Sequence, residues 1–274
     1  IGTEKMPNRR VDGQVRGRSG RQGDPGSSRF YASLEDDLFV TLGSVKQKDI
    51  PPRRWRESTT KRLLARAQRA SEDRASGARK LSKDFDIAMA RQRELVYRMR
   101  AQVIAGEPIT AGGLDALARA VLREAAGTQA WQTPDALMRY VFDNLTYRLP
   151  PDLDAVDLDD RERVLDVLMG MFTEAAREKV EQLGDPEMFT RFRNIVFLKA
   201  IDMAWIEQVD FLEQLKTVVQ DRNLAQHKVE YEYRREAYFA FEEMKQRINR
   251  DIVRLLCLSQ IERGADGGLI IQFA

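Results

Sequence analysis

The sequence predicts a mainly α-helical chain whose first 45 residues form the end of an α/β lobe. Four long stretches, 55–104, 161–183, 189–220 and 229–258, contain no proline and repeat apolar residues at helical spacing. Glycine and proline clusters near 106–113 and 150–151 separate shorter helical patterns. With 274 residues, 43% hydrophobic and 32% charged, the chain has enough apolar material for one or two cores.

Residues 1–45 predict a helix at Pro7–Val15, a loop rich in glycine and arginine, and a short strand at Ser28–Ser33. One helix and one strand cannot bury their apolar faces alone. The chain also starts at Ile1 without an initiating methionine, and it contains no phosphate-binding G-x-x-x-x-G-K-[ST] loop. We therefore expect a fragment of a longer protein, in which the rest of the lobe lies elsewhere.

The loop from Gln14 to Gly26 is the candidate chemical site. Arginine stays charged and offers a planar fork of donors that stabilises negative charge on a phosphoryl group. Glycine lacks the Cβ that would hold phosphate oxygens away. For the short run GRSGR taken alone, a basic surface loop is the default explanation. The pattern alternates three arginines with three glycines: Arg16, Gly17, Arg18, Gly20, Arg21 and Gly23.

The stretch 55–104 predicts one long helix. At about 1.5 Å per residue it would span on the order of 75 Å, so we expect it to bridge domains. Residues 53–100 carry 15 Lys or Arg against 6 Asp or Glu. Such a basic arm can meet nucleic acid, an anionic membrane or an acidic partner, although evenly spread arginines are more often the solvated face of a helix.

Residues 107–188 predict a small acidic helical domain, since 101–189 carry 17 Asp or Glu against 8 Lys or Arg. Thr133 before Pro134 is the expected N-cap of one of its helices. The pattern at 161–183 is a clear amphipathic helix. The acidic cluster before it is explained by a solvated loop or an acidic helix start: Asp157, Asp159 and Asp160.

Residues 189–263 predict an antiparallel helical hairpin, with helices at 189–220 and 229–258 around the polar turn 221–228. His227, the only histidine, is expected to be an exposed turn residue. Residues 264–274 predict a turn and a short extended apolar end. With a single cysteine, Cys257, the chain cannot form an internal disulfide. With one cysteine and one histidine, we expect no structural metal site. No apolar run reaches the length of a membrane span.

The spacing Q-x-x-G-R-x-G-R, from Gln14 to Arg21, resembles the last motif of the second RecA-like lobe in helicase-type ATPases. The longer string IGTEKMPNRRVDGQVRGRSGRQGDPGSSRFYASLEDDL at 1–38 resembles SecA, the bacterial preprotein translocase motor. The likeness continues in LLARAQRASEDRASGARKLSKDFD at 63–86 and in LAQHKVEYEYRREAY at 224–238.

The chain departs from the SecA pattern at three places and has no Cys-rich zinc tail. It reads Phe85-Asp86-Ile87-Ala88 where that family has Tyr-Asp-Asp-Val, Gln208 where a histidine is frequent, and Leu224 where tyrosine is common. These departures favour an accessory SecA paralogue that serves a dedicated export route.

The resemblance implies five parts: the end of the second RecA-like nucleotide-binding lobe, the long helix of the helical scaffold, a helical wing, a two-helix finger and a short tail. It implies ATP as cofactor, with Mg²⁺ held mainly by parts of the motor outside this chain. It places Arg18 and Arg21 at the γ-phosphate as catalytic residues and Gln14, Gly17 and Gly20 beside the nucleotide. At the finger tip it implies contact with preprotein or channel through Asn223, Leu224, Ala225 and Gln226. In order, the lobe end spans 1–45, the scaffold helix 46–106, the wing 107–188, the finger 189–263 and the tail 264–274.

The function that the resemblance implies is the C-terminal part of an ATP-driven protein-translocation motor. Its partners would be preprotein, a SecY-type channel and the missing first nucleotide-binding lobe, while anionic lipid and a homodimer are further candidates. The location would be cytoplasmic, peripherally associated with the plasma membrane. Nucleic acid is not expected, because no aromatic stacking platform lies beside the basic stretch. A nucleic-acid helicase fragment and a non-catalytic helical scaffold for partner proteins remain the alternatives.

Overall fold

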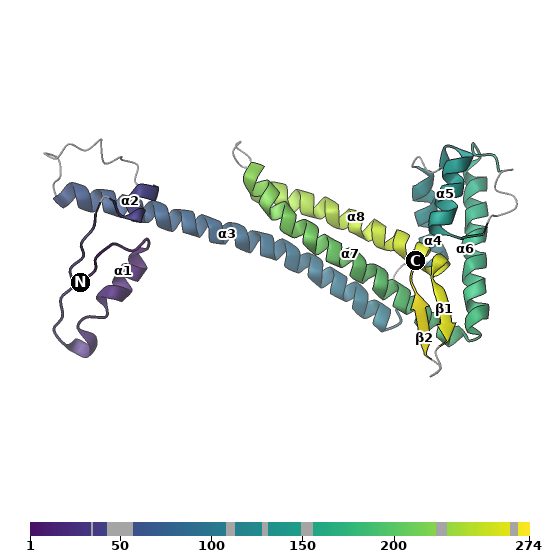
Figure 1. The fold of residues 1–274 in the computed structure, drawn as a ribbon, viewed down its shortest axis with the longest axis horizontal. Helices are drawn as coiled ribbons and strands as arrows, with labels where there is room; N and C mark the ends of the chain where they lie inside the picture. The colour runs from purple at the N-terminus through teal and green to yellow at the C-terminus, as the bar shows by residue number, and fades with distance from the viewer. Residues whose placement is uncertain are drawn as a thin grey trace. The chain divides into compact units, whose positions relative to one another are not determined.

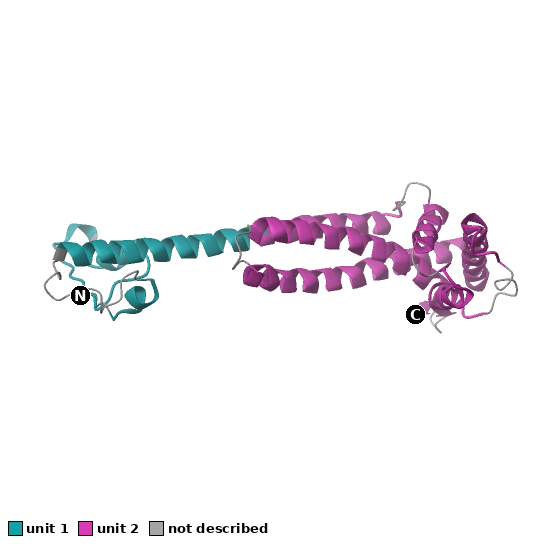
Figure 2. Ribbon diagram, turned by 90° about the horizontal axis from the view of Figure 1, so that it is seen from above, with its two compact units in different colours: residues 1–84 teal, residues 85–274 magenta. Residues whose placement is uncertain are grey.

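The computed structural model describes residues 1–33, 35–42, 57–107, 113–127, 131–148, 156–222, 229–263 and 268–274, without the side chains of Arg21, Glu57 and Arg263. These residues form eight α-helices and one two-stranded sheet, which confirms the mainly α class (Figure 1). They divide into two compact units, 1–84 and 85–274 (Figure 2). None of the helices in these ranges is long and apolar enough to cross a membrane.

Unit 1 begins with α1 (Arg9–Arg16), close to the predicted helix at Pro7–Val15. Asn8 caps its start, because the Asn8 side chain accepts a hydrogen bond of 2.7 Å from the backbone N of Arg10. A short turn, η1 (Arg21–Gly23), follows in the glycine and arginine loop, and its middle residue, Gln22, has a left-handed φ of 55°.

The predicted strand at Ser28–Ser33 is wrong. Phe30 alone forms a β-bridge there, parallel to Gly2, through bonds from Gly2 N to Arg29 O and from Tyr31 N to Gly2 O. The chain bends directly after Gly2, so the pairing has no further partner residues and no ladder forms.

Helix α2 (Asp37–Leu42) was not indicated by the sequence pattern. It is defined by packing: Leu38 and Phe39 are buried against Ala67 of α3 (Glu57–Ile104). Helix α3 confirms the predicted long helix at 55–104, and Gly106, with φ of 75°, follows its end. Its first part belongs to unit 1 and its second part to unit 2.

Three helices of unit 2 form the acidic helical region: α4 (Gly113–Ala126), α5 (Pro134–Asn144) and α6 (Arg161–Leu183). The predicted N-cap is confirmed, because Thr133 Oγ1 accepts from Ala136 N at 3.2 Å. Asp160 caps α6 by accepting from Arg163 N at 3.0 Å, which confirms the helix-start explanation for this residue. Asp157 and Asp159 are exposed in the turn before α6, as the solvated-loop explanation predicts. Gly184 ends α6 in the left-handed conformation, with φ of 65°.

The predicted hairpin is formed by α7 (Pro186–Arg222) and α8 (Val229–Leu258), which run side by side (Figure 1). Apolar residues at helical spacing pack between them and against α4, α5 and α6 to form the core of unit 2. An ion pair of 2.8 Å between Arg222, the last residue of α7, and Glu236 joins the two helices.

The chain ends in a β-ribbon made of β1 (Gln260–Arg263) and β2 (Leu269–Gln272), with Ile261 opposite Ile271. The extended end predicted within 264–274 is therefore confirmed, whereas its partner strand was not predicted. Helix α6 holds β1: Lys179 Nζ donates to Ser259 O at 2.5 Å, and Gln182 Nε2 donates to Ile261 O at 2.8 Å.

Candidate functional site

The glycine and arginine loop of unit 1 folds back on itself. Gly20 has φ of 69°, and a Cβ there would lie 2.8 Å from the carbonyl oxygen of Asp24. A Cβ on Gly26 would lie 2.5 Å from Gly20 N and from Ser19 Oγ. Ser19 Oγ also donates to Ser27 O at 3.1 Å, which closes the loop. Positions 20 and 26 thus require glycine for the loop to stay compact.

Gly17 differs from Gly20, although both are predicted site residues. It is the C-cap of α1, with φ of −65°, and a Cβ there would meet only ordinary contacts at 3.5 and 3.6 Å. The backbone therefore does not require glycine at position 17. Its value to a phosphate site would be the close approach that a missing side chain allows.

The loop exposes its polar side chains to solvent. Arg18 and Gln14 are exposed, and the Arg18 guanidinium has no ion pair or hydrogen bond within the described part of the chain. Arg16 instead lies 5.4 Å from the centre of the Phe30 ring, in cation–π contact. The side chain of Arg21 lies outside the described residues. Arg18 is thus the described guanidinium of the motif that is available for an anion.

A buried carboxylate anchors α1. Asp12 accepts hydrogen bonds from Lys5 Nζ at 2.8 Å, Met6 N at 3.1 Å and Gln68 Nε2 at 2.7 Å. Burial raises the pKa of Asp12, but the hydrogen bonds from Lys5, Gln68 and Met6 outweigh it and hold that pKa below its ordinary value. Asp12 is therefore a charged group satisfied inside the protein.

Gln68 connects this anchor to α3, and it also donates to Met6 O at 2.9 Å. A second connection lies close by: Arg9 N donates to Glu72 at 2.7 Å, and Arg9 donates to Ala65 O at 3.4 Å. The helix that precedes the arginine loop is therefore bound to the first part of α3. Sequence reasoning missed Asp12 and Gln68, because a polar residue on a helix gives no periodic signal of burial.

An open pocket of ≈ 690 Å³ lies between the loop region and α3, within unit 1. Lys5 and Phe30 both line this pocket, and Lys5 Nζ is 4.4 Å from the centre of the Phe30 ring. Cations and hydroxyls are the groups that anionic ligands require. The residues that line it include Lys5, Arg16, Ser28, Phe30, Thr60, Lys61 and Gln68. In the described ranges no three His, Cys, Asp or Glu side chains gather as a metal-binding group.

The predicted contact residues of the hairpin tip, Asn223, Leu224, Ala225 and Gln226, lie outside the described residues, as does His227. Their role stays a prediction. On either side of them, Val219 of α7 and Val229 of α8 are buried.

Two of the departures noted in the sequence are buried contacts in unit 2. Gln208 of α7 donates to Gln92 Oε1 of α3 at 3.0 Å, and Gln92 Nε2 donates to Ala237 O of α8 at 2.9 Å. The rings of Phe85 and Tyr233 lie 4.3 Å apart between their centres. The second part of α3 is thus joined to both helices of the hairpin.

Two family models match the chain: the SecA Wing and Scaffold domain over residues 56–260 and the SecA P-loop domain over residues 1–53. Similar proteins include the protein translocase subunit SecA 2 of Streptococcus sanguinis (strain SK36), which is 36% identical over 287 residues, or 100% of this chain. The corresponding subunits of Streptococcus gordonii and Staphylococcus haemolyticus (strain JCSC1435) are each 33% identical, over 100% and 98% of this chain. The chain spans 35% to 36% of the length of these relatives.

Proposed function

The chain belongs to the SecA family, and we propose that it forms the part of a SecA-type protein-translocation motor that senses nucleotide and relays the response to a helical hairpin. The single observation that carries this proposal is the buried hydrogen bond of 2.7 Å between Asp12 and Gln68. It fixes the helix in front of the arginine loop to α3, so a displacement of the loop acts directly on α3.

Contacts of α3 in unit 2 support the second half of the relay. Gln92 bonds to both hairpin helices, and Phe85 packs on Tyr233 of α8. A shift of α3 therefore changes contacts on α7 and α8 together. In this proposal the hairpin tip, Asn223 to Gln226, contacts preprotein or a SecY-type channel.

The residues of the loop are suited to contact one side of the phosphate groups of a nucleoside triphosphate. Arg18 offers a free guanidinium, and Gly20 and Gly26 keep the supporting backbone compact. We propose that Arg18 and Arg21 stabilise charge on the γ-phosphate, with Gln14 positioning it. ATP supplies the phosphoryl group that is transferred to water, and Mg²⁺ is held mainly outside this chain.

The names of the relatives favour an accessory SecA paralogue, and we propose that role for the whole protein. We also propose that the first nucleotide-binding lobe is supplied from outside this chain. The whole protein would lie in the cytoplasm and bind peripherally to the plasma membrane. The chain itself would divide into five functional parts: 1–45, 46–106, 107–188, 189–263 and 264–274. Anionic lipid and a second copy of the protein are candidate partners.

The test is the replacement Arg18→Ala or Arg21→Ala in the whole protein. ATP turnover should fall by about 10³-fold or more, because a guanidinium at the transferred phosphoryl group contributes this much to catalysis. Binding of a fluorescent ATP analogue should change little. Arg29→Ala, an exposed arginine outside the motif, is the matched control and should keep its turnover.

Unchanged turnover in both variants would refute the assignment. Stimulation of turnover by oligonucleotides, rather than by preprotein and lipid vesicles, would point to a nucleic-acid helicase instead.

A further inference from the structure

The aromatic ring of Phe30 lies close to two cations in unit 1. Lys5 Nζ is 4.4 Å from the centre of the ring, and the guanidinium carbon of Arg16 is 5.4 Å from it. A cation at such a distance is attracted by the negative face of an aromatic ring. Arg16 is the last residue of α1, and Phe30 follows the arginine loop. Their contact therefore joins the two ends of residues 17–29.

The backbone on both sides of Phe30 is bonded to Gly2. Gly2 N donates to Arg29 O at 2.8 Å, and Tyr31 N donates to Gly2 O at 2.9 Å. The half-buried ring covers this glycine closely, because a Cβ on Gly2 would lie 2.4 Å from Phe30 Cδ1. The position of the ring is thus set by the start of the chain, and Arg16, which is exposed, rests on it.

Lys5 connects the ring to the anchor of α1. Its ammonium group also donates to Asp12 at 2.8 Å, and its side chain is only 12% exposed. Asp12 in turn accepts a hydrogen bond from Gln68 of α3. The contacts from Arg16 through Phe30, Lys5 and Asp12 to Gln68 therefore connect the end of the arginine loop to the long helix.

The loop is held differently at its two ends. At its start, Arg18 N donates to Val15 O at 3.1 Å, so the loop continues directly from the last turn of α1. Within the loop, Ser19 Oγ donates to Ser27 O at 3.1 Å. At its end, the backbone is held beside Phe30. The cation–π contact of Phe30 with α1 is thus placed to fix the direction in which the loop leaves the helix.

We propose that Arg16 and Phe30 form a clamp that positions the arginine loop for phosphoryl transfer. Arg16 acts through the Phe30 ring and not on a phosphate, so both are positioning residues. This inference rests on the proposed function, in which Arg18 and Arg21 contact the γ-phosphate, and it adds Phe30, which lies outside the motif.

Two variants of the whole protein break the clamp from opposite sides. Phe30→Leu removes the ring but keeps apolar bulk, and Arg16→Met removes the charge but keeps the length of the side chain. Hydrogen exchange at 17–29 should be about two- to fivefold faster in each, which is the factor that an exposed cation–π contact contributes. The kcat for ATP should fall about fivefold while KM changes less than about twofold, because a displaced loop weakens contacts made in the transition state.

Further variants separate the clamp from a purely structural role. Phe30→Tyr keeps the ring and should restore both exchange and kcat. Arg16→Met/Phe30→Leu should match Phe30→Leu alone, since the ring contact is then already lost. Arg10→Met and Tyr31→Leu are matched controls that should change neither quantity, because Arg10 is an exposed arginine of α1 and Tyr31 is an exposed ring next to Phe30. Circular dichroism verifies that all variants are folded.

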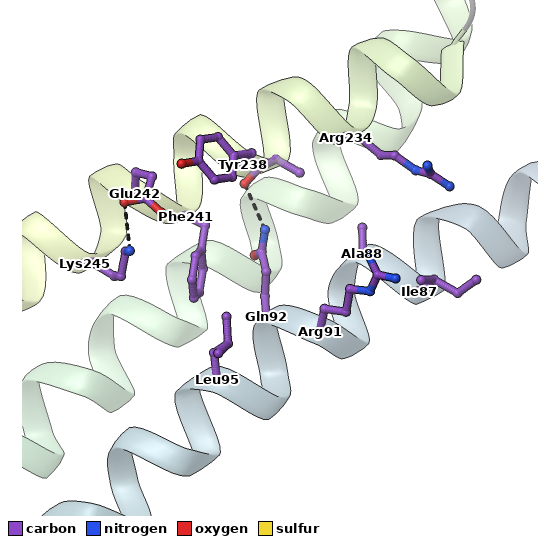
Figure 3. Close-up of a pocket in the computed structure, with 11 residues that line it drawn as sticks. Ile87, Ala88, Arg91, Gln92, Leu95, Arg234, Tyr238, Phe241, Glu242 and Lys245 are labelled. Atoms are coloured by element: carbon purple, nitrogen blue, oxygen red, sulfur yellow. Dashed lines mark hydrogen bonds and ion pairs between the residues drawn. The ribbon is translucent and has the colours of Figure 1, made fainter.

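A hydrogen bond in unit 2 provides a control for general destabilisation. Gln92 Nε2 donates to Ala237 O at 2.9 Å (Figure 3), and this buried bond belongs to unit 2, whereas the clamp belongs to unit 1. Gln92→Leu leaves Ala237 O without this donor and should destabilise unit 2, yet exchange at 17–29 should be unchanged. Exchange there as fast as in Phe30→Leu would assign the effect to general destabilisation and overturn the clamp.

Three other outcomes would overturn the proposal: unchanged exchange at 17–29 in both clamp variants, a Phe30→Tyr variant as impaired as Phe30→Leu, or additive losses in the double variant. Arg18→Ala and Arg21→Ala distinguish its failure from that of the proposed function. If they abolish turnover while the clamp variants keep their kcat, the proposed function holds and the positioning role is refuted. If they leave turnover unchanged, the proposed function fails and the positioning role fails with it, whatever the exchange at 17–29.

Discussion

Gln208 Nε2 donates a hydrogen bond of 3.0 Å to Gln92 Oε1, and both side chains are buried, with 2% and 7% of their residues' surface exposed. Gln92 in turn donates to Ala237 O, so two neutral amides bridge three helices. An amide keeps the same donors and acceptors across the physiological pH range, whereas a histidine at position 208 would titrate there.

Gln208→Leu should destabilise unit 2 by about 1–3 kcal/mol, because it leaves the buried Gln92 Oε1 without its donor. Urea unfolding followed by tryptophan fluorescence measures the change, since Trp131 and Trp205 both lie in unit 2. The double variant Gln92→Leu/Gln208→Leu should recover much of the loss, since both partners become apolar. Additive losses would show that the amides do not interact in the way described.

Gly20→Ala should disrupt the arginine loop. Its Cβ would lie 2.8 Å from Asp24 O, at a φ of 69° that alanine adopts only with strain of about 1–2 kcal/mol. Faster hydrogen exchange at 18–27 and lower ATP turnover of the whole protein are the expected results. Gly17→Ala is the control for hydrogen exchange only, because its φ and its contacts suit a Cβ. Equally fast hydrogen exchange in the two variants would contradict this account of the loop.

Asp12 should make unit 1 sensitive to acid. Since the folded-state pKa lies below the ordinary 3.8, the carboxylate contributes stability above pH 3.8 that is lost as the pH falls through the lowered value. Asp12→Asn should lower the free energy of unfolding by about 1–3 kcal/mol at pH 7. The loss should be much smaller below the lowered pKa of Asp12, where the carboxyl group of the unmodified protein is also neutral. Hydrogen exchange of α1 at neutral pH and thermal melts down to pH 2 measure the difference. A cost that stays constant with pH would contradict the assignment.

Cys257 should resist modification in the folded chain. Burial raises the pKa of its thiol from 9.0 to about 12, so the thiolate population at pH 8 falls by roughly a thousandfold. Iodoacetamide labelling, followed by mass spectrometry, should therefore be slow in buffer and fast in urea. Because this is the only cysteine, the signal belongs to one site. Rapid labelling of the native chain would show that α8 opens there.

The helices with strong apolar periodicity were predictable from the sequence. Helix α8 runs from Val229 to Leu258, the predicted bounds, and Thr133 caps α5 as its position before Pro134 indicated. Such features depend on neighbours within a few residues of one another. Local rules also place the arginine loop, because Gly20 and Arg18 belong to one continuous motif.

Elements that depend on distant partners were not predictable. Helix α2 exists where Leu38 and Phe39 meet Ala67, and β1 depends on pairing with β2, which begins at Leu269. The predicted strand around Phe30 failed because β propensity needs a neighbour to pair with, and Phe30 pairs with Gly2 alone. The anchor of the site, Asp12 with Gln68, joins residues 56 positions apart.

The bonds that α6 makes to the C-terminal ribbon also affect how the protein associates. An unpaired strand edge offers carbonyl groups to any passing extended chain. Ser259 O, just before β1, and Ile261 O, within it, already accept hydrogen bonds from Lys179 Nζ and Gln182 Nε2. Side chains of a helix thus leave fewer unpaired carbonyl groups at β1 for an additional strand, which lowers the tendency of the ribbon to aggregate.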